Sequence, residues 1–250
     1  MRFLAAGREY NISLFSKLGL LKKMRRNTSQ PGSATLFFEH VYIVTRLLSV
    51  PKATEGVVGE FGCFNGFSTA TLSLACAMTG RRLVVFDSFE GLPEPESTVH
   101  NFDTGQRVQY QKGQYAGTLE TVRENVTRFG NVAVCEFVKG YFDETLPRRD
   151  EAEKFVMIFE DADLPQSVKS VLTGAWKKLQ PNGTFFSHEA RDREVVDLFF
   201  DRQWWSDNIG EPAPGFAGSG VGILGGPFWG WCYLGYAMRR LSREQSSRLG

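Results

Sequence analysis

Two hydrophobic patterns alternate along the chain from residue 56 onward. Short apolar runs of strand length occupy residues 56–62, 82–87, 134–139, 155–160 and 184–187. Between them, apolar residues recur with the helical period over residues 67–79, 117–129, 166–179 and 192–202. Strands that alternate with helices predict an α/β fold with three layers around a mostly parallel sheet. The last apolar runs, Val221–Leu224 and Trp231–Met238, predict a C-terminal antiparallel hairpin at the edge of that sheet.

The chain before the first strand carries only the helical pattern. Residues 11–26 predict a short amphipathic helix with Leu14, Leu18 and Leu21 on one face and basic residues around it. We favour a helix that caps the domain and holds its charges in water. Docking to a membrane surface or to a partner is the alternative.

A second helix is predicted over residues 35–48, and Pro51 ends it. We therefore divide the chain into a helical extension over residues 1–50 and a ligand-binding domain over residues 51–250. The extension could also pack between subunits, so the sequence is compatible with a homo-oligomer.

A glycine turn joins the first strand to the first helix of the domain. Its pattern is E-x-G-x-x-x-G, from Glu60, Gly62 and Gly66. Asp87 ends the next strand, 21 residues after Gly66 (87 − 66), where a carboxylate can accept hydrogen bonds from ribose hydroxyls. A strand-end glutamate would repel a pyrophosphate, but it suits a cationic ligand group such as the amine or sulfonium of S-adenosylmethionine. A plain strand–turn–helix without a ligand is the alternative.

Polar residues cluster where the predicted strands end. The cluster comprises Glu60, Asp87, Asp161, Asp163, His188 and Glu189. Ligands bind at the carboxyl ends of the strands in open α/β sheets, so this coincidence of position predicts one site there. Ser88–Tyr115 follows the second strand without a clear period. We interpret this segment as a lid over the ligand, with a mobile surface insertion as the alternative.

The composition of the chain disfavours nucleic-acid binding, zinc binding and a membrane span. The chain has 250 residues and a net charge of +1, so it carries no global basic field for nucleic acid. Its four cysteines form no C-x-x-C pair, which makes zinc unfavourable and fits a reducing, cytoplasmic setting. The uncharged stretch Pro212–Met238 is long enough to span a membrane, but its many glycines favour a hairpin.

Several motifs stand in an order that resembles a known family. They are E-x-G-x-x-x-G-x-S at Glu60–Ser68, VFDSFEGLP at Val85–Pro93, KGYF-x-x-TLP at Lys139–Pro147, and D-x-D-L at Asp161–Leu164. Over about residues 55–190 the chain resembles the macrocin O-methyltransferase (TylF-like) family of class I methyltransferases. The resemblance implies a Rossmann-like, seven-stranded sheet, S-adenosylmethionine as the methyl donor, and a hydroxyl of a small natural product or sugar as the acceptor.

The resemblance also implies which residues meet the donor. They are Glu60, Gly62, Phe64, Asn65, Gly66, Ser68, Asp87, Ser88, Gly140, Tyr141 and Asp161. Aromatic side chains such as Phe64, Phe89, Trp204, Trp205 and Trp229 would exclude water from the site, although the tryptophans suit a core equally well.

The chain departs from the family it resembles at the metal site. Relatives carry D-x-D and a later D-D for magnesium, whereas the later pair here reads His188-Glu189. Asp161, His188 and Glu189 are therefore candidate ligands for magnesium or for a transition metal, and a site without metal is the alternative. Without metal the acceptor hydroxyl needs a base, for which His188 and Asp163 are the two candidates.

The sequence leaves three alternatives to methyl transfer. A donor-binding protein of the same fold that has lost turnover is the main alternative, because of the altered His188-Glu189 pair. A pyridine-nucleotide oxidoreductase is disfavoured by the missing third fingerprint glycine. Nucleic-acid methylation is disfavoured by the neutral charge and by the lack of a motif for a flipped base.

Overall fold

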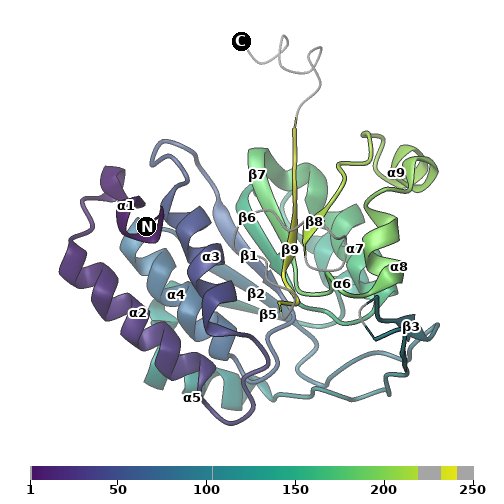
Figure 1. The fold of residues 1–250 in the computed structure, drawn as a ribbon, viewed down its shortest axis with the longest axis horizontal. Helices are drawn as coiled ribbons and strands as arrows, with labels where there is room; N and C mark the ends of the chain where they lie inside the picture. Colours follow the sequence, from purple (N-terminus) through teal and green to yellow (C-terminus); the bar gives the residue numbers. More distant parts are fainter. Residues whose placement is uncertain (1, 103, 219–231, 241–250) are drawn as a thin grey trace.

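The computed structural model describes residues 2–102, 104–218 and 232–240. Within these ranges a seven-stranded sheet has the order β5-β2-β1-β6-β7-β9-β8 (Figure 1). Its strands are β1 (Val57–Phe61), β2 (Leu83–Asp87), β5 (Cys135–Lys139), β6 (Phe155–Glu160), β7 (Leu179–Ser187), β8 (Ala217–Gly218) and β9 (Gly235–Met238). The first five in this order are parallel, and β9 runs antiparallel to both β7 and β8. The predicted, mostly parallel α/β sheet is confirmed.

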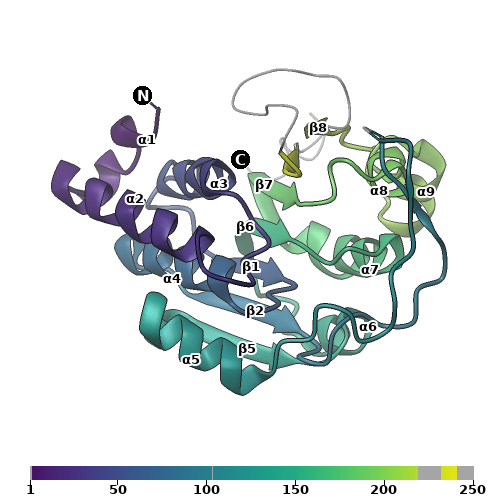
Figure 2. The same cartoon turned by 60° about the horizontal axis from the view of Figure 1, so that its bottom comes forward.

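Helices cover both faces of the sheet (Figure 2). One face carries α2 (Leu14–Thr28), α3 (Phe37–Leu48), α4 (Phe67–Thr79) and α5 (Leu119–Phe129). The other face carries α6 (Phe142–Thr145), α7 (Pro165–Ala175), α8 (Arg193–Leu198) and α9 (Arg202–Asn208). Among the described residues, no helix is both long enough and apolar enough to cross a membrane.

Shorter elements complete the chain. They are α1 (Arg2–Ala5), the two-stranded sheet of β3 (Val99–His100) and β4 (Arg107–Val108), and the 3₁₀ helices Arg8–Tyr10, Val132–Val134, Leu146–Arg148 and Trp176–Lys178. The pair β3–β4 lies inside the stretch predicted to be irregular.

The central strands are apolar on both sides because both faces of the sheet are covered. Val84 and Phe86 of β2 point into one hydrophobic cluster with α7, α8 and α9, while Val85 points into the other with α2–α5. This packing explains why continuous apolar runs, rather than alternating ones, marked the strands in the sequence.

The helical extension packs on the domain by a different face from the one predicted. Ser13 caps α2 by accepting a hydrogen bond from the Ser16 amide. The buried residues of α2 are Lys17, Leu20, Met24 and Asn27, whereas Leu14 and Leu18 are exposed. The buried Lys17 is accommodated because its Nζ donates to the carbonyl of Leu4 at 2.8 Å. The spacing of the leucines alone therefore indicated the wrong face of α2 as the buried one.

The C-terminal third differs from the prediction in three places. The helix predicted over residues 192–202 is two helices, α8 and α9. β7 begins at Leu179, five residues before the strand predicted over residues 184–187. Within the described residues β9 pairs with β7 and with Ala217–Gly218 of β8. The predicted strand Val221–Leu224 lies outside the described residues, as does Trp231.

The strand order positions the site. β1 lies between β2 and β6, and the chain leaves β1 to form β2 on one side and later returns to form β6 on the other. A ligand crevice forms at such a switch point, outside the carboxyl ends of the strands. The loops after β1, β2, β6 and β7 therefore meet at one edge of the sheet.

Candidate active site

A cavity of about 630 Å³ lies at that edge. The loop after β1 contributes Gly62 and Phe64 to its lining, and the end of β2 contributes Asp87 and Ser88. Other lining residues follow β5, β6 and β7 or come from the segment between β2 and α5, and they include Tyr141, Asp161, Asp163, His188, Glu189, Tyr110 and Tyr115. The structure thus brings nine of the predicted site residues to one cavity.

Gly62 allows close contact between two backbone segments, whether or not a ligand is bound. Its φ is +85°, and a Cβ added there would lie 2.0 Å from the carbonyl oxygen of Asp161. The loop after β1 can therefore approach the loop after β6 only if this residue is glycine. Phe64, two residues on, also has left-handed backbone, with φ of 47°, and its ring packs edge-on against Tyr115.

Asp87 holds two loops at the floor of the cavity. Its Oδ2 accepts a hydrogen bond from the Cys63 amide and its Oδ1 accepts one from the Phe89 amide, both at 2.7 Å. Burial raises the pKa of Asp87, and these two bonds oppose that effect. Each carboxylate oxygen has a second lone pair, so the side chain can still accept from a ligand hydroxyl. Ser88 shapes the next turn by donating to the carbonyl of Gly91 at 2.8 Å.

Five residues predicted to meet the donor do not line the cavity: Glu60, Asn65, Gly66, Ser68 and Gly140. Glu60 is fully buried below α4, beside the hydroxyls of Ser68 and Thr69. Burial raises the pKa of Glu60 to about 8, against the lowering effect of those hydroxyls. Asn65 donates to the carbonyl of Gly32, which ties the helical extension to the glycine turn.

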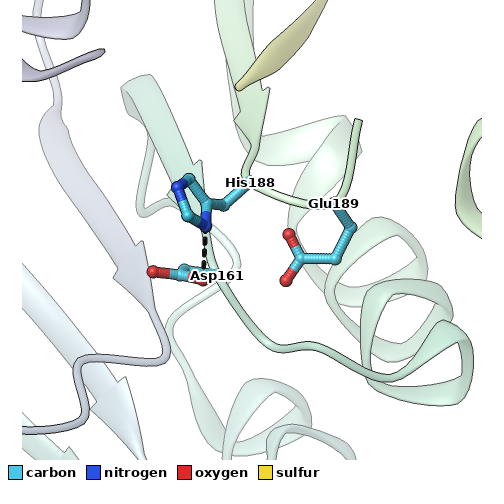
Figure 3. A group of neighbouring side chains, drawn as sticks. All are labelled: Asp161, His188 and Glu189. Carbon is cyan, nitrogen blue, oxygen red and sulfur yellow. Dashed lines mark ion pairs between the residues drawn. The ribbon is translucent and has the colours of Figure 1, made fainter. Parts of the chain in front are cut away.

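His188 lies between two carboxylates. Its Nδ1 is 3.2 Å from Oδ1 of Asp161 (Figure 3), and its Nε2 is 3.1 Å from Oε2 of Glu39. A carboxylate only accepts, so each ring nitrogen must donate, and a ring that donates from both nitrogens is an imidazolium. Burial alone would lower the pKa of His188, but the charges of Asp161 and Glu39 outweigh burial and raise it well above 6.5.

Glu39 is the residue of this site that the sequence did not reveal. It lies in the first turn of α3, its side chain is fully buried, and it accepts hydrogen bonds from the amides of Leu36 at 2.7 Å and Tyr233 at 2.9 Å. Burial would raise the pKa of Glu39, but the His188 charge and these bonds lower it to about 2. A glutamate three residues after a helix start is a capping-box signal, but that signal gives no hint of a partner 149 residues away.

The remaining acids gather beside Asp161. Asp163 has left-handed backbone, with φ of 60°, and its amide donates to Oε1 of Glu189 at 2.7 Å. Burial, followed by the negative charge of Asp161, raises the pKa of Asp163 well above 3.8. Burial and the neighbouring carboxylates likewise raise the pKa of Glu189 well above 4.5. Oε2 of Glu189 has no hydrogen-bond partner within the described part of the chain.

Asp161, His188 and Glu189 are the residues that would hold the metal implied by the family. Ligand atoms of Asp161, His188 and Glu189, which are drawn in Figure 3, lie within 4.8 Å of one another. However, both ring nitrogens of His188 already face carboxylates, so neither offers a lone pair. Mg²⁺ requires about six oxygen ligands in a tight octahedron. As they lie in the structure, these residues do not fit a magnesium ion.

The segment between β2 and α5, which the sequence analysis interprets as a lid, contributes to the lining of the cavity. Val108, Tyr110 and Tyr115 line the cavity from this segment. The amide of Phe102 donates to the carbonyl of Arg191 at 2.8 Å, which ties the segment to the loop before α8.

The other aromatic residues named from the sequence lie elsewhere. Trp205 is fully buried in the core and donates to the carbonyl of Leu198, and Trp204 packs against the same core. Neither tryptophan lines the cavity, so the core interpretation holds for this pair. Phe89 is buried below the cavity, and Trp229 lies outside the described residues.

The fold and its strand-end cavity define a class I methyltransferase fold. Two solved structures share this fold. Their sequence identity to this chain is low, so the similarity shows the fold alone. The O-methyltransferase NovP superposes with a TM-score of 0.60 and 16% identity, covering 92% of this chain and 83% of NovP. CalS11, a calicheamicin methyltransferase, gives a TM-score of 0.54 and 18% identity over 90% of this chain and 93% of CalS11.

The chain belongs to the macrocin O-methyltransferase (TylF) family, whose profile matches residues 51–199. This is a family of S-adenosylmethionine-dependent methyltransferases, as the resemblance implied. A curated relative from Streptomyces olivaceus is 36% identical over 167 residues. It is named 8-demethyl-8-(2,3-dimethoxy-alpha-L-rhamnosyl)-tetracenomycin-C 4'-O-methyltransferase. The match covers 63% of this chain and 64% of that relative, so it spans less than two thirds of the relative's length.

Proposed function

We propose that this protein transfers the methyl group of S-adenosylmethionine to a sugar hydroxyl of a small natural product. The observation that carries the proposal is the cavity at the carboxyl ends of the strands. It joins a glycine turn and Asp87 on one side to a half-buried carboxyl group, Asp163, on the other. Its volume of about 630 Å³ lies within the range of ligand sites, which is about 300–1,000 Å³.

The donor half of the cavity is assigned to the loops after β1, β2 and β5. Asp87 would accept from the ribose hydroxyls through its remaining lone pairs, while Gly62, Phe64, Ser88 and Tyr141 would line the donor. S-adenosylmethionine supplies an electrophilic methyl group on a positively charged sulfur.

The residues outside the lining support the donor half rather than touch it. Asn65 and Gly66 set the turn before α4, and Gly140 donates through its amide to the carbonyl of Asp87. Glu60 and Ser68 pack behind the turn, where they place a carboxyl group and a hydroxyl group.

Asp163 is the proposed general base. The acceptor hydroxyl must lose its proton as its oxygen attacks the methyl carbon, and a carboxylate with a raised pKa takes that proton more readily. Burial and the charge of Asp161 give Asp163 such a pKa, and its side chain lines the cavity. His188 is less suited to this role, because both of its nitrogens already donate to carboxylates.

The charge of the cavity supports an acceptor without phosphate groups. Among the described residues, its charged lining side chains other than His188 are all acidic: Asp87, Glu94, Glu96, Asp143, Asp161, Asp163, Glu189 and Asp192. These acids would repel a nucleotide-activated sugar. The curated relative is named for a rhamnosyl group on tetracenomycin C, which agrees with a sugar already attached to an aglycone.

The test has a binding stage and a turnover stage. Calorimetry with S-adenosylhomocysteine should give binding that Asp87→Ala abolishes, and binding by neither protein would refute the proposal. Mass spectrometry should then detect a methylated product from glycosylated natural products but not from the matched nucleotide sugars. Asp163→Asn should keep donor binding and lose about 10²–10⁴-fold in kcat. Donor binding without turnover across the panel would favour a binding protein that has lost catalysis.

A further inference from the structure

We propose that the imidazolium of His188, clamped by Asp161 and Glu39, stands in place of the divalent cation in this active site. Glu39 is thereby a positioning residue contributed by the helical extension. The inference deepens the proposed methyl transfer and rests on it for its functional meaning. Its structural content, a site that binds no divalent cation, can be tested independently of turnover.

The first argument is the disposition of the ring. His188 ends at the cavity with only 10% of its side chain exposed, and its nitrogens face Oδ1 of Asp161 at 3.2 Å and Oε2 of Glu39 at 3.1 Å. A histidine that binds a metal must present a bare nitrogen to it. Here a rotation that exposed either nitrogen would break a buried ion pair, and breaking such a pair is strongly unfavourable.

The second argument is the anchoring of Glu39. Its Oε1 accepts from the Tyr233 amide and its Oε2 accepts from the Leu36 amide as well as facing His188. The carboxylate is therefore fixed from three directions, by the start of α3, the end of β7 and the approach to β9. A side chain held in this way keeps its partner in one orientation, which is what a preformed site requires.

The third argument is charge balance. Asp161, Asp163 and Glu189 bring three carboxyl groups to one end of the cavity, and Glu39 adds a fourth behind His188. Burial and mutual repulsion raise the pKa of Asp163 and of Glu189, and the positive charge of His188 opposes that rise. Among the described residues that line the cavity, His188 is the sole basic side chain. The ring thus supplies from within the chain the charge that a bound ion would otherwise bring.

Glu189 offers the acceptor a polar contact in addition to that with Asp163. Oε2 of Glu189 is buried, lines the cavity through its residue, and has no partner within the described residues. The geometry leaves it free to accept a hydrogen bond from a second hydroxyl of the acceptor. A sugar diol would then be held by carboxyl groups at Asp163 and Glu189.

The first experiment measures cation binding to the purified full-length chain. Calorimetric titration of the wild-type protein with MgCl₂ and with MnCl₂ should give no stoichiometric binding. His188→Asp should acquire a site, because it replaces the imidazolium with a carboxylate beside Asp161 and Glu189. Saturating Mn²⁺ should then raise the melting temperature of His188→Asp by roughly 5 °C or more and leave that of the wild type unchanged.

A matched control separates this effect from the loss of any buried imidazole. His40 is buried one residue after Glu39 and does not line the cavity, so His40→Asp should gain no Mn²⁺ response. Stoichiometric binding of Mg²⁺ or Mn²⁺ by the wild type would overturn the proposal, whether or not methyl transfer is detected.

A second measurement reads the ring directly, and it serves even if His188→Asp fails to fold. The chain has three histidines, so ¹⁵N–¹H spectra of the imidazoles are simple to assign. At neutral pH both ring nitrogens of His188 should carry protons in the wild type, and Glu39→Gln should alter the signal of Nε2 most. A ring with one bare nitrogen would contradict the assignment. Activity, once an acceptor is found, should change by less than about twofold with EDTA.

Discussion

Replacing Glu39 by glutamine is expected to destabilise the fold by roughly 3 kcal/mol at pH 7. The pKa of Glu39 falls from 4.5 to about 2 on folding, and each pKa unit is worth about 1.4 kcal/mol, which gives roughly 3 kcal/mol. Direct removal of one member of a buried ion pair gives a similar figure, about 3–5 kcal/mol. The two routes agree because the same contacts, from His188, Leu36 and Tyr233, lie behind both.

The pH dependence gives this prediction a second, signed readout. Because the pKa of Glu39 is depressed in the folded state, its contribution is present above 4.5 and is lost as pH falls toward 2. The difference between wild type and Glu39→Gln should therefore shrink to about 1 kcal/mol at pH 3. Urea denaturation at several pH values measures both quantities.

A double-mutant cycle identifies the partner. If Glu39 acts through His188, then Glu39→Gln should cost far less in a His188→Gln background, with a coupling of at least about 2 kcal/mol. A cost below about 1 kcal/mol at pH 7, or a cost that does not change with pH, would refute the reasoning. Additive effects in the cycle would place the contribution of Glu39 in the Leu36 and Tyr233 bonds instead.

Two further predictions concern the glycine turn and the acid before it. Gly62→Ala should lose more than about 2 kcal/mol in denaturant unfolding, because its Cβ would lie 2.0 Å from a carbonyl oxygen. Gly80→Ala is the matched control, since its φ is also positive and nothing lies within 4 Å of an added Cβ, so equal losses would show that φ strain alone matters. Burial raises the pKa of Glu60 to about 8, so wild-type stability should fall by about 3 kcal/mol between pH 4.5 and 7 through this residue. Glu60→Gln should lack that fall in pH-dependent urea unfolding, and identical pH profiles for the two proteins would contradict it.

Much of the fold followed from the sequence because its central strands are buried on both sides. The apolar runs that end at Asp87 and Glu160 could belong only to covered strands, and the helical period between them placed α4 and α5 within two residues. The face of α2 could not be predicted in this way. Its inward positions include a lysine, Lys17, which can be buried because its Nζ donates a hydrogen bond to the carbonyl of Leu4 in α1.

The site followed from the sequence in part. Residues at the ends of strands converge because parallel strands share an edge, which brought Asp87, Asp161 and His188 to one cavity. The state of His188 could not be predicted, because it depends on Glu39, which lies outside the residues that match the family. Tertiary packing decides which residues far apart in the sequence become partners. The sequence pattern around one residue of such a pair does not identify the other.

Residues with left-handed backbone conformation around the cavity set the stability of the fold against its catalytic activity. Phe64, Tyr115 and Asp163 line the site with φ values of 47°, 58° and 60°, conformations that cost non-glycine residues about 1–3 kcal/mol each. Glycine at these positions would relieve the strain and lose the rings and the carboxyl group that face the ligand. Variants selected for heat resistance and variants selected for speed are therefore expected to diverge first along this rim.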